Sequence, residues 1–362
     1  MRDASGNPLD GIPTTGLDRD GLIRLLAARG YPPYRADQVR HGLFHRGATR
    51  WSEIPGLPRA LQEEMEEAVP LLSSRLQKSL TGPEGTTKLA LELADGQLVE
   101  AAVIPAGPRR TLCLSTQAGC PVGCAFCASG LGGLARNLEP WEMVEQFLHA
   151  RRATGEKINH LVVMGIGEPL YNLDNLLAAL ATLQDERGGA IGARRIVVST
   201  IGVIPGMARL QERRPPLQLA VSLHAADPAL RSRLVPPAHD YGVQEIVAAA
   251  RAYQEATGRQ VTFEAVLLRE VNDGPEAARR MAELLAGGGF FVNLIPCNPV
   301  AGLPYRPPRP GRIEAFAATL AHRGVAVRVR RPRGAAGEAA CGQLRASIRR
   351  EGTKGMDRHP PA

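Results

Sequence analysis

The feature that most restricts the fold of this 362-residue chain is a regular alternation of short apolar runs and amphipathic stretches after Pro105. The apolar runs resemble strands in length and composition and lie at 112–115, 161–164, 196–199, 217–223, 261–267, 291–296 and 325–329. Helical patterns separate most of them, at 141–153, 176–184, 205–213, 243–256, 276–286 and 313–322. Strands that alternate with helices form a parallel sheet covered by helices, so we expect an α/β fold, either a full or partial β/α barrel or an open doubly wound sheet. No Gly-x-Gly-x-x-Gly follows the first strand, which argues against a dinucleotide-binding sheet.

The chain before Pro105 has a different pattern. From about residue 16 to 72, apolar residues recur at three-to-four spacing with prolines between them, which predicts several short helices. Two alternating segments, 88–93 and 97–104, then flank Asp95-Gly96, a strong hairpin signal. We therefore predict a helical accessory domain over 1–80, a β-hairpin linker over 81–105, a core over 106–344 and a basic flexible tail over 345–362.

Three of the six cysteines, Cys120, Cys124 and Cys127, lie within eight positions of one another. Three thiolates on one short loop can hold a metal centre and leave one coordination position free for chemistry. Structural zinc usually takes four protein ligands, often from two separated pairs, and this chain has no second pair. An iron-sulfur cluster held by cysteines fits better, with a zinc or disulfide staple as the alternative.

Composition favours a cytoplasmic protein and permits, without requiring, an anionic partner. No stretch approaches the roughly 18 apolar residues that a membrane span needs, and we expect no secretory leader. Cysteines grouped in this way suit a reducing compartment. The formal net charge of +8 permits an RNA partner, and the arginine clusters at 328–333 and 345–350 are the best candidates for phosphate contacts.

Polar residues recur where successive predicted strands end. Glu168 follows one strand, Ser199 ends the next, Ser222 and His224 end a third, and Asn298 follows a fourth. Any one of them has a structural explanation, such as a helix cap or a hydrogen-bonded core histidine. In a β/α barrel the catalytic groups gather at this edge of the sheet, so their recurrence predicts a ligand site there.

The cysteine spacing resembles that of radical S-adenosylmethionine (SAM) enzymes, and the whole set of motifs resembles the radical SAM RNA adenosine methyltransferases, the RlmN/Cfr family. The cysteine motif alone is common to many enzymes. Cys113, seven residues before it, and the Ala-Ala-Cys-Gly-Gln-Leu segment at 339–344 are particular to this family. The other matching segments are 34–38, 95–100, 111–115, 165–169, 199–200, 222–225, 272–273 and 293–299.

The resemblance implies a radical SAM partial β/α barrel with a small N-terminal helical domain and a linking β-hairpin. It implies that a [4Fe-4S] cluster is bound by Cys120, Cys124 and Cys127. It also implies that SAM is bound by Gly167, Glu168, Ser199, Ser222, Leu223, His224 and Asn298.

In the mechanism implied by the resemblance, Cys341 becomes S-methylated, Cys113 resolves the later covalent link to RNA, and Glu100 accepts a proton near the target base. From the residues alone, Cys113 is equally explained as a small buried residue, and Glu100 as a residue on the solvent face of its hairpin. Cys297 has no role in the family, and we interpret it as a core residue.

The expected reaction is methylation of C2 of an adenosine in 23S ribosomal RNA, with tRNA as a further candidate substrate. Two SAM molecules are used per methylation, and an electron donor such as flavodoxin or ferredoxin reduces the cluster. We expect a monomer in the cytoplasm.

Two departures from the family pattern keep alternatives open. Ile201 follows Ser199-Thr200 as in the Cfr branch, which methylates C8. The segment at 334–338 is Gly-Ala-Ala-Gly-Glu, where the family commonly shows acidic residues around an isoleucine before Cys341. The remaining alternatives are a metal-stapled RNA-binding protein without catalysis and a radical SAM enzyme that acts on another substrate.

Overall fold

The structure, a computed structural model, describes residues 12–213 and 216–330 together with Leu344 and Ile348. Cys341, the segment at 334–338 and most of the predicted basic tail lie outside the described residues.

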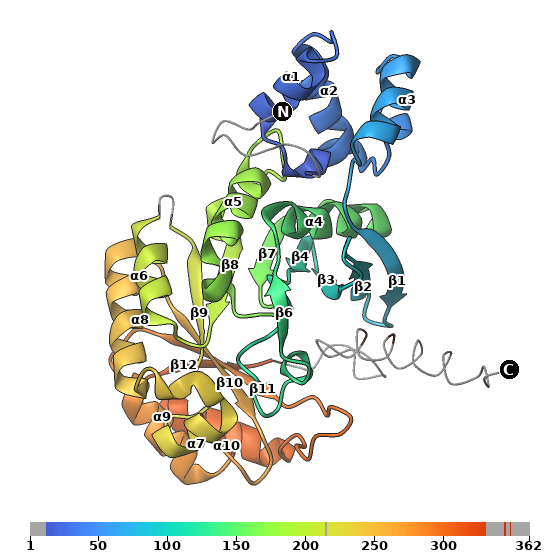
Figure 1. The fold of residues 1–362 in the computed structure, drawn as a ribbon. Coiled ribbons are helices and arrows are strands. Elements are labelled where there is room, and N and C mark those ends of the chain that lie inside the picture. Colours follow the sequence, from blue (N-terminus) through green and yellow to red (C-terminus); the bar gives the residue numbers. More distant parts are fainter. Residues whose placement is uncertain (1–11, 214–215, 331–343, 345–347, 349–362) are drawn as a thin grey trace, which may run out of the picture.

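A ten-stranded sheet forms the centre of the molecule, in the order β1-β2-β3-β4-β7-β8-β9-β10-β11-β12 (Figure 1). The antiparallel part consists of β1 (Arg75–Thr81), β2 (Thr87–Glu92), β3 (Leu98–Ala106) and β4 (Arg109–Cys113). The strands that continue parallel to β4 are β7 (His160–Val163), β8 (Ile196–Thr200), β9 (Gln218–Ser222), β10 (Thr262–Leu267), β11 (Phe291–Pro296) and β12 (Ala326–Val329). Because β1 and β12 are edge strands that do not pair with each other, the sheet is open, as a partial barrel requires.

Helices connect the parallel strands and cover one face of the sheet (Figure 1). They are α4 (Pro140–Thr154), α5 (Leu173–Gln184), α6 (Ile204–Glu212), α8 (Val243–Thr257), α9 (Pro275–Leu285) and α10 (Pro310–His322). Helix α7 (Pro228–Leu234) packs elsewhere, because its Leu230 and Leu234 belong to a separate, smaller hydrophobic cluster. Alternate strand residues, such as Val163, Val198 and Phe263, join the covering helices in one hydrophobic core. We call this the outer face of the sheet and the opposite one the inner face. The predicted fold class is therefore confirmed, including each predicted strand and helix of the core.

A short helix of the core and an edge strand are among the elements that were not predicted. Helix α7 is only seven residues long and follows a strand end directly. Strand β1 extends the hairpin of β2 and β3, yet most of its side chains are exposed, Leu76 and Leu80 among them. A solvent-exposed edge strand has no buried face and therefore no strict alternation for sequence reasoning to detect.

The N-terminal part is helical, as predicted, with α1 (Arg19–Ala27), α2 (Tyr34–His41) and α3 (Arg59–Ala68). Asp18 caps α1 by accepting a 2.6 Å hydrogen bond from the amide of Gly21. Between the helices, the Trp51 indole is fully buried and donates a 2.8 Å bond to the carbonyl of Val69. Short helical turns complete the chain at Thr14–Gly16, Gly42–Arg46, Trp51–Glu53, Ala128–Gly130, Pro169–Asn172, Ala193–Arg195 and Pro236–His239.

The N-terminal helices and the sheet share a single hydrophobic core. The predicted division at residue 80 falls inside β1, and it stays a prediction. The predicted hairpin is confirmed, with Gly96 at a φ of +77° in its turn. No helix among the described residues is long and apolar enough to cross a membrane.

Candidate active site

The three clustered cysteines lie on the loop between β5 (Gln117–Gly119) and β6 (Leu134–Asn137), which form a separate two-stranded sheet. The amide of Cys120 donates a 2.9 Å bond to the carbonyl of Gly133. Farther along, the amide of Ala125 donates a 2.9 Å bond to the carbonyl of Leu234, at the end of α7. Main-chain bonds thus fix both the start and the middle of the cysteine loop.

Glycine is required where this loop begins. Gly119 has a φ of +92°, and a Cβ atom there would lie 2.0 Å from the carbonyl oxygen of Gly133. A side chain at this position is therefore excluded by both its backbone conformation and the facing strand. The sequence Gly119-Cys120 brings the first thiol close against the returning chain.

A second, smaller hydrophobic cluster lies under the cysteine loop. Its partly buried members include Cys120, Cys124 and Phe126, which pack against it. Its buried members are Val122, Ala225, Leu234, Val235, Leu268 and Cys297. The interpretation of Cys297 as a core residue is confirmed.

The environment of the thiols disfavours their ionisation by the protein alone. Burial raises the pKa of Cys120, and burial together with the charges of Cys127 and Cys120 raises the pKa of Cys124. Arg231, a buried cation on α7, opposes this effect at Cys124. Thiols held this way need a positively charged centre to become thiolates.

The loop after β7 approaches β4 very closely. A Cβ atom at Gly165 would lie 2.6 Å from both the Leu114 carbonyl oxygen and the Ser115 hydroxyl. Gly167 has a φ of +112°, and a Cβ there would lie 2.7 Å from the side chain of Gln117. The two glycines let the main chain of this loop lie directly beside the strand that leads to the cysteines.

Glu168 is fully buried at the end of this loop and bridges two strand ends. Its carboxylate accepts a 3.1 Å bond from the amide of Leu170 and a 2.9 Å bond from the amide of Ile201, after β8. Burial raises the pKa of Glu168 to about 7, although these amide donors oppose the shift. The carboxylate itself therefore holds the loops together, and its role towards SAM stays a prediction.

The sheet register places several predicted site residues on its inner face. Residues opposite each other on neighbouring strands have side chains on the same face. By this rule Glu100, Cys113, Ser199 and Ser222 all belong to the face opposite the helix-packed core. The hydroxyl oxygens of Ser199 and Ser222 lie 3.3 Å apart.

His224, just after β9, has a strained backbone and a buried ring. Its φ is +62°, an uncommon value for a non-glycine residue that is often associated with functional sites. Its Nδ1 accepts a 3.2 Å bond from the amide of Val266, and burial lowers the pKa of the ring to about 3. The neutral ring meets Phe126 of the cysteine loop edge-on, with 4.8 Å between centroids. The structure thus brings His224 next to the cysteines.

Leu223 and Asn298, two further predicted SAM contacts, differ in their surroundings. The side chain of Leu223 is buried in the main core, and its amide donates a 3.0 Å bond to the carbonyl of Glu264. Asn298 follows β11 and is half-buried, and its carbonyl accepts a 3.4 Å bond from the Cys297 thiol. Any contact of these two residues with SAM stays a prediction.

Glu100 and Cys113 lie on the adjacent strands β3 and β4. Cys113 is opposite Ala102, so the Cα atoms of Glu100 and Cys113 are diagonal neighbours about 7–8 Å apart. Glu100 is buried and its Oε2 lies 3.7 Å from Nζ of Lys88, which is also buried. The alternative that Glu100 faces solvent is therefore wrong. The alternative for Cys113 was that it is a small buried residue. Cys113 is indeed buried, but on the inner face of the sheet rather than in the helix-packed core.

Comparisons with known proteins agree with these features. A family model described as the radical SAM superfamily matches residues 114–282. A protein of Rhodopirellula baltica, named a probable dual-specificity RNA methyltransferase RlmN, is 44% identical over 90% of this chain and 88% of its own length. A protein of the same name from Symbiobacterium thermophilum is 42% identical over 94% of this chain and 92% of its own length.

A solved structure gives the same result. The crystal structure of a radical SAM methyltransferase from Sphaerobacter thermophilus superimposes with a TM-score of 0.88 at 40% sequence identity, covering 91% of this chain and 98% of that one. The chain belongs to the RlmN family of radical SAM methyltransferases. The family resemblance seen in the sequence is thereby confirmed, and the non-catalytic alternative has no support.

Membership of the RlmN family implies a [4Fe-4S] cluster and SAM, and the three cysteines fit such a cluster. The three cysteines lie on one loop over an apolar cluster. Because burial raises the pKa of Cys124, a positively charged centre is needed to make its thiol a thiolate. In the described part of the chain, no three His, Cys, Asp or Glu side chains form a group that could hold a metal ion. A single zinc needs all its donors within about 2–2.5 Å of one point, whereas a cluster spreads its thiolates over several irons, so the zinc staple gains no support.

Sequence reasoning missed three charged residues of this RlmN-family site. Arg231 donates a 3.2 Å bond to the carbonyl of Leu223 and a 2.5 Å bond to that of Ile201, so it joins two strand ends beneath the cysteine loop. Its position in a short helix gave no signal. Glu264 did give one, because it is a charged residue inside an apolar strand pattern, whereas Lys88 stands at the start of its predicted strand, after two threonines.

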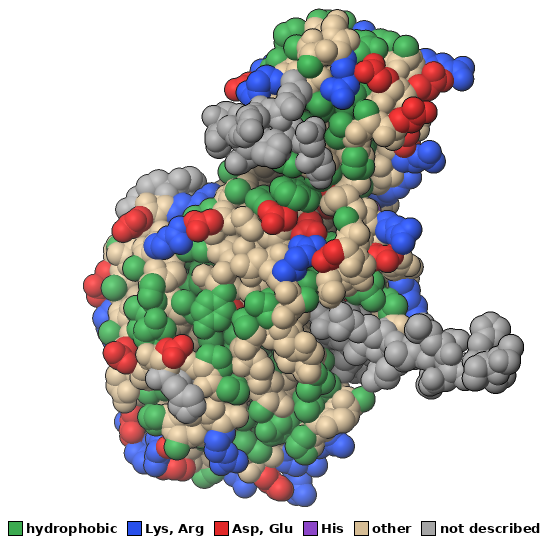
Figure 2. Space-filling model, viewed as in Figure 1, with side chains coloured by type: hydrophobic (Ala, Val, Ile, Leu, Met, Phe, Trp, Pro, Cys, Tyr) green, Lys and Arg blue, Asp and Glu red, His purple; other side chains and the backbone are tan. Residues whose placement is uncertain are grey.

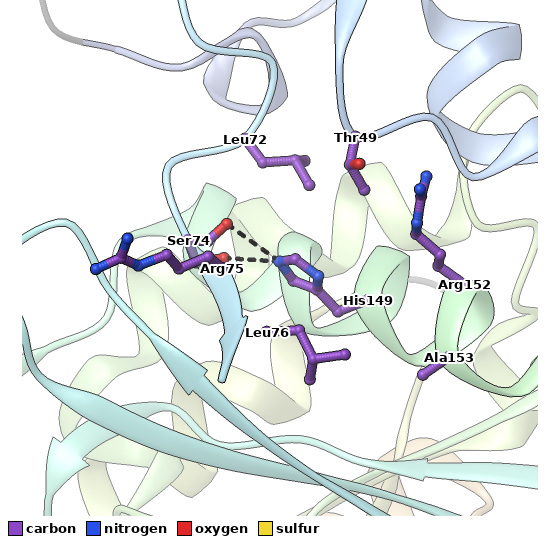
Figure 3. Close-up of a pocket in the computed structure, with 8 residues that line it drawn as sticks. All are labelled: Thr49, Leu72, Ser74, Arg75, Leu76, His149, Arg152 and Ala153. Carbon is purple, nitrogen blue, oxygen red and sulfur yellow. Dashed lines mark hydrogen bonds between the residues drawn. The ribbon is translucent and has the colours of Figure 1, made fainter. Parts of the chain in front are cut away.

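Cavities also lie away from this site. One of about 320 Å³ lies between the N-terminal helices and α4, where His149 Nε2 is 3.2 Å from the Ser74 hydroxyl (Figure 3). It is lined by Thr49, Leu72, Ser74, Arg75, Leu76, His149, Arg152 and Ala153. None of the predicted site residues lines it, and its two arginines are paired with Glu92 and Glu53.

Proposed function

We propose that this chain methylates C2 of an adenosine in 23S ribosomal RNA, and an adenosine in tRNA as a second substrate, through a methyl group carried on Cys341. The relatives are named dual-specificity RNA methyltransferases, which supports two kinds of RNA substrate. The observation that carries the proposal is the shared inner face of Glu100 and Cys113, the one offering a base and the other a thiol on neighbouring strands.

Each part of the site has an assigned task. Cys120, Cys124 and Cys127 bind the cluster, and the strand-end residues Gly167, Glu168, Ser199, Ser222, Leu223, His224 and Asn298 bind SAM. When bound, the cluster and SAM supply hydrogen-atom abstraction, which an aromatic carbon without a lone pair requires for methylation. Two SAM molecules are used per product, one of them as the methyl donor to Cys341.

Glu100 removes the proton from the carbon that receives the methyl group. Its carboxylate is buried, and its Oε2 lies 3.7 Å from the buried Lys88 ammonium nitrogen. The Ser115 hydroxyl donates a 2.6 Å bond to the main-chain carbonyl of Glu100 and fixes the strand at this point. The base is thus held in place from both its side chain and its main chain.

Cys113 releases the product. Its thiolate attacks the sulfur of Cys341 and a disulfide between the two cysteines forms. The S–C bond breaks with its electron pair left on the methylene carbon attached to the base, and this carbon takes up a proton to become the methyl group. Two thiols are therefore required, because the first remains bonded to the RNA until the second displaces it.

Ile201, the residue that resembles the C8 branch, does not favour C8 over C2. Its amide donates to Glu168 and its carbonyl accepts from Arg231. The side chain packs against both hydrophobic clusters. Ile201 thus acts through its main chain and through apolar packing. An isoleucine can fill both roles in an enzyme of either branch.

The test is mass spectrometry of nucleosides from 23S ribosomal RNA and tRNA incubated anaerobically with the reconstituted protein, a reductant and methyl-labelled SAM. Label in 2-methyladenosine is the expected result. Label in 8-methyladenosine would assign the chain to the other branch. Deoxyadenosine formed without labelled RNA would show that the substrate assignment is wrong.

The partners in the cell follow from this reaction. A low-potential electron carrier such as flavodoxin or ferredoxin is needed to reduce the cluster, and ribosomal RNA is met in the cytoplasm. The monomeric state stays a prediction.

A further inference from the structure

A buried carboxylate that none of the roles above uses lies in the middle of the inner face. Glu264, on β10, is 5% exposed. Its Oε1 accepts a 2.9 Å bond from the side-chain amide of Asn293 on β11, while its Oε2 is buried without a hydrogen-bond partner. Burial raises the pKa of this carboxyl group, against the opposing effects of Asn293 and Arg330.

A buried carboxylate oxygen without a hydrogen-bond partner is energetically unfavourable unless a donor binds to it. Buried polar atoms in native proteins are nearly always hydrogen-bonded, and exceptions require an explanation. A carboxylate that loses water without gaining donors raises the free energy of the folded state. The unused acceptor of Glu264 therefore indicates a ligand that donates a hydrogen bond to it.

The position of Glu264 connects it to the predicted SAM-binding strand ends. In the sheet register it lies directly between Ser222 of β9 and Asn293 of β11. Its main-chain carbonyl accepts bonds of 3.0 and 3.2 Å from the amides of Leu223 and His224. A displacement of Glu264 would thus displace the strand end that carries three predicted SAM contacts.

The distance to the cysteine loop can be read along β10. Val266, two residues further on and on the same face, packs against the hydrophobic cluster under that loop. Two residues of a strand span about 6.6 Å. Along the inner face of β10, the side chain of Glu264 therefore comes next after that of Val266, and it lies farther from the cysteine loop.

We propose that Oε2 of Glu264 accepts a hydrogen bond from a ribose hydroxyl of bound SAM. The inference rests on the proposed function, since it requires SAM as the ligand. The amino and carboxylate groups of SAM belong at the open position of the cluster, and its sulfonium carries no hydrogen-bond donor. The donors that remain are the adenine amino group and the two ribose hydroxyls. Only a hydroxyl is donor and acceptor at one atom, and so matches a row of Ser222, Glu264 and Asn293, which offers both.

The inference is tested by the affinity of the cluster-loaded protein for S-adenosylhomocysteine, measured by calorimetry without reductant or RNA. Glu264→Gln should raise the Kd about tenfold or more, because the amide nitrogen that replaces Oε2 cannot accept the hydrogen bond. The 2′,3′-dideoxy analogue should bind the wild type and this variant with nearly equal Kd. The melting temperature without ligand should change little, because Oε2 has no protein partner to lose.

The outcomes separate this inference from the proposed function. If the wild type binds neither nucleoside, the proposed function fails and the inference with it. If the wild type binds but Glu264→Gln binds equally well, or loses affinity equally for both ligands, only the ribose contact is refuted. Should Glu264→Gln not fold, Glu264→Asp gives the same test. Its side chain keeps the carboxyl group but is one methylene group shorter, so the acceptor oxygen moves away from the ribose.

Discussion

At the level of single residues, main-chain donors rather than side chains hold the buried polar groups of the site. Glu168 accepts from two amides, and His224 accepts from a third. Arg231 in turn donates to two carbonyls. Because these bonds join separate strand ends, each of the three side chains fixes the shape of the site as well as its polarity.

The elevated pKa of Glu168 leads to a pH-dependent stability. A carboxyl group whose pKa rises on folding, here from 4.5 to about 7, contributes stability that is fully present below pH 4.5 and is lost as the pH rises through 7. Glu168→Gln removes this dependence. The difference in unfolding free energy between wild type and variant should therefore fall by up to about 3 kcal/mol between pH 4.5 and pH 8, measured by urea unfolding of the SAM-free protein. A difference that stays constant over this range would contradict the assignment.

At the level of elements, the cysteine loop depends on glycines whose roles differ. Gly119 lies against the Gly133 carbonyl, whereas nothing lies within 4 Å of the Cβ position of Gly123. Both have positive φ, at +92° and +62°. A side chain at Gly119 would thus meet both a steric clash and backbone strain, whereas a side chain at Gly123 would meet backbone strain alone.

Gly119→Ala should lower the free energy of unfolding by more than about 3 kcal/mol and abolish iron incorporation, because its Cβ overlaps a carbonyl oxygen. Gly123→Ala, the matched control, should cost only about 1–2 kcal/mol of strain and retain its cluster. Iron content and the visible absorption of the reconstituted variants provide the measurement. Equal iron content in the two would show that the close approach at Gly119 is unimportant.

The parallel strands could be predicted because each has a buried face, and the strand-end polar residues could be predicted because barrels place them there. The shared inner face could not, since it depends on the register between strands far apart in sequence. Lys88 and Glu100 illustrate this, because only the pairing of β2 with β3 brings their charges to 3.7 Å. Arg231 is a more extreme case, because its partners are carbonyls of two other loops.

At the level of the whole molecule, one buried carboxylate joins the N-terminal segment to the core. Glu145 of α4 accepts a 2.6 Å bond from the Thr15 hydroxyl and 2.8 Å bonds from the amides of Ser73 and Ser74. The N-terminal helices do not form a single basic surface, since basic and acidic side chains alternate across the visible face (Figure 2). Arginines and carboxylates are equal in number over residues 12–68. A role of these helices in RNA binding therefore depends on shape and position more than on net charge.

Glu145→Leu should lower the free energy of unfolding by about 3 kcal/mol or more, because it leaves buried amides and hydroxyls without an acceptor. Glu63→Leu serves as the control, since Glu63 is exposed and pairs only with Arg59 one turn away, a contact that contributes less than about 1 kcal/mol. Urea unfolding measures both. Similar losses would mean that Glu145 does not join the two parts.

The most direct test of the account is the fate of RNA in the Cys113→Ala variant. If Cys113 releases the product from Cys341, this variant completes the first steps but cannot break the S–C bond. Denaturing electrophoresis and mass spectrometry of the peptide containing Cys341 should then show RNA covalently attached to the protein. Free methylated RNA formed by Cys113→Ala at the wild-type rate would contradict the account.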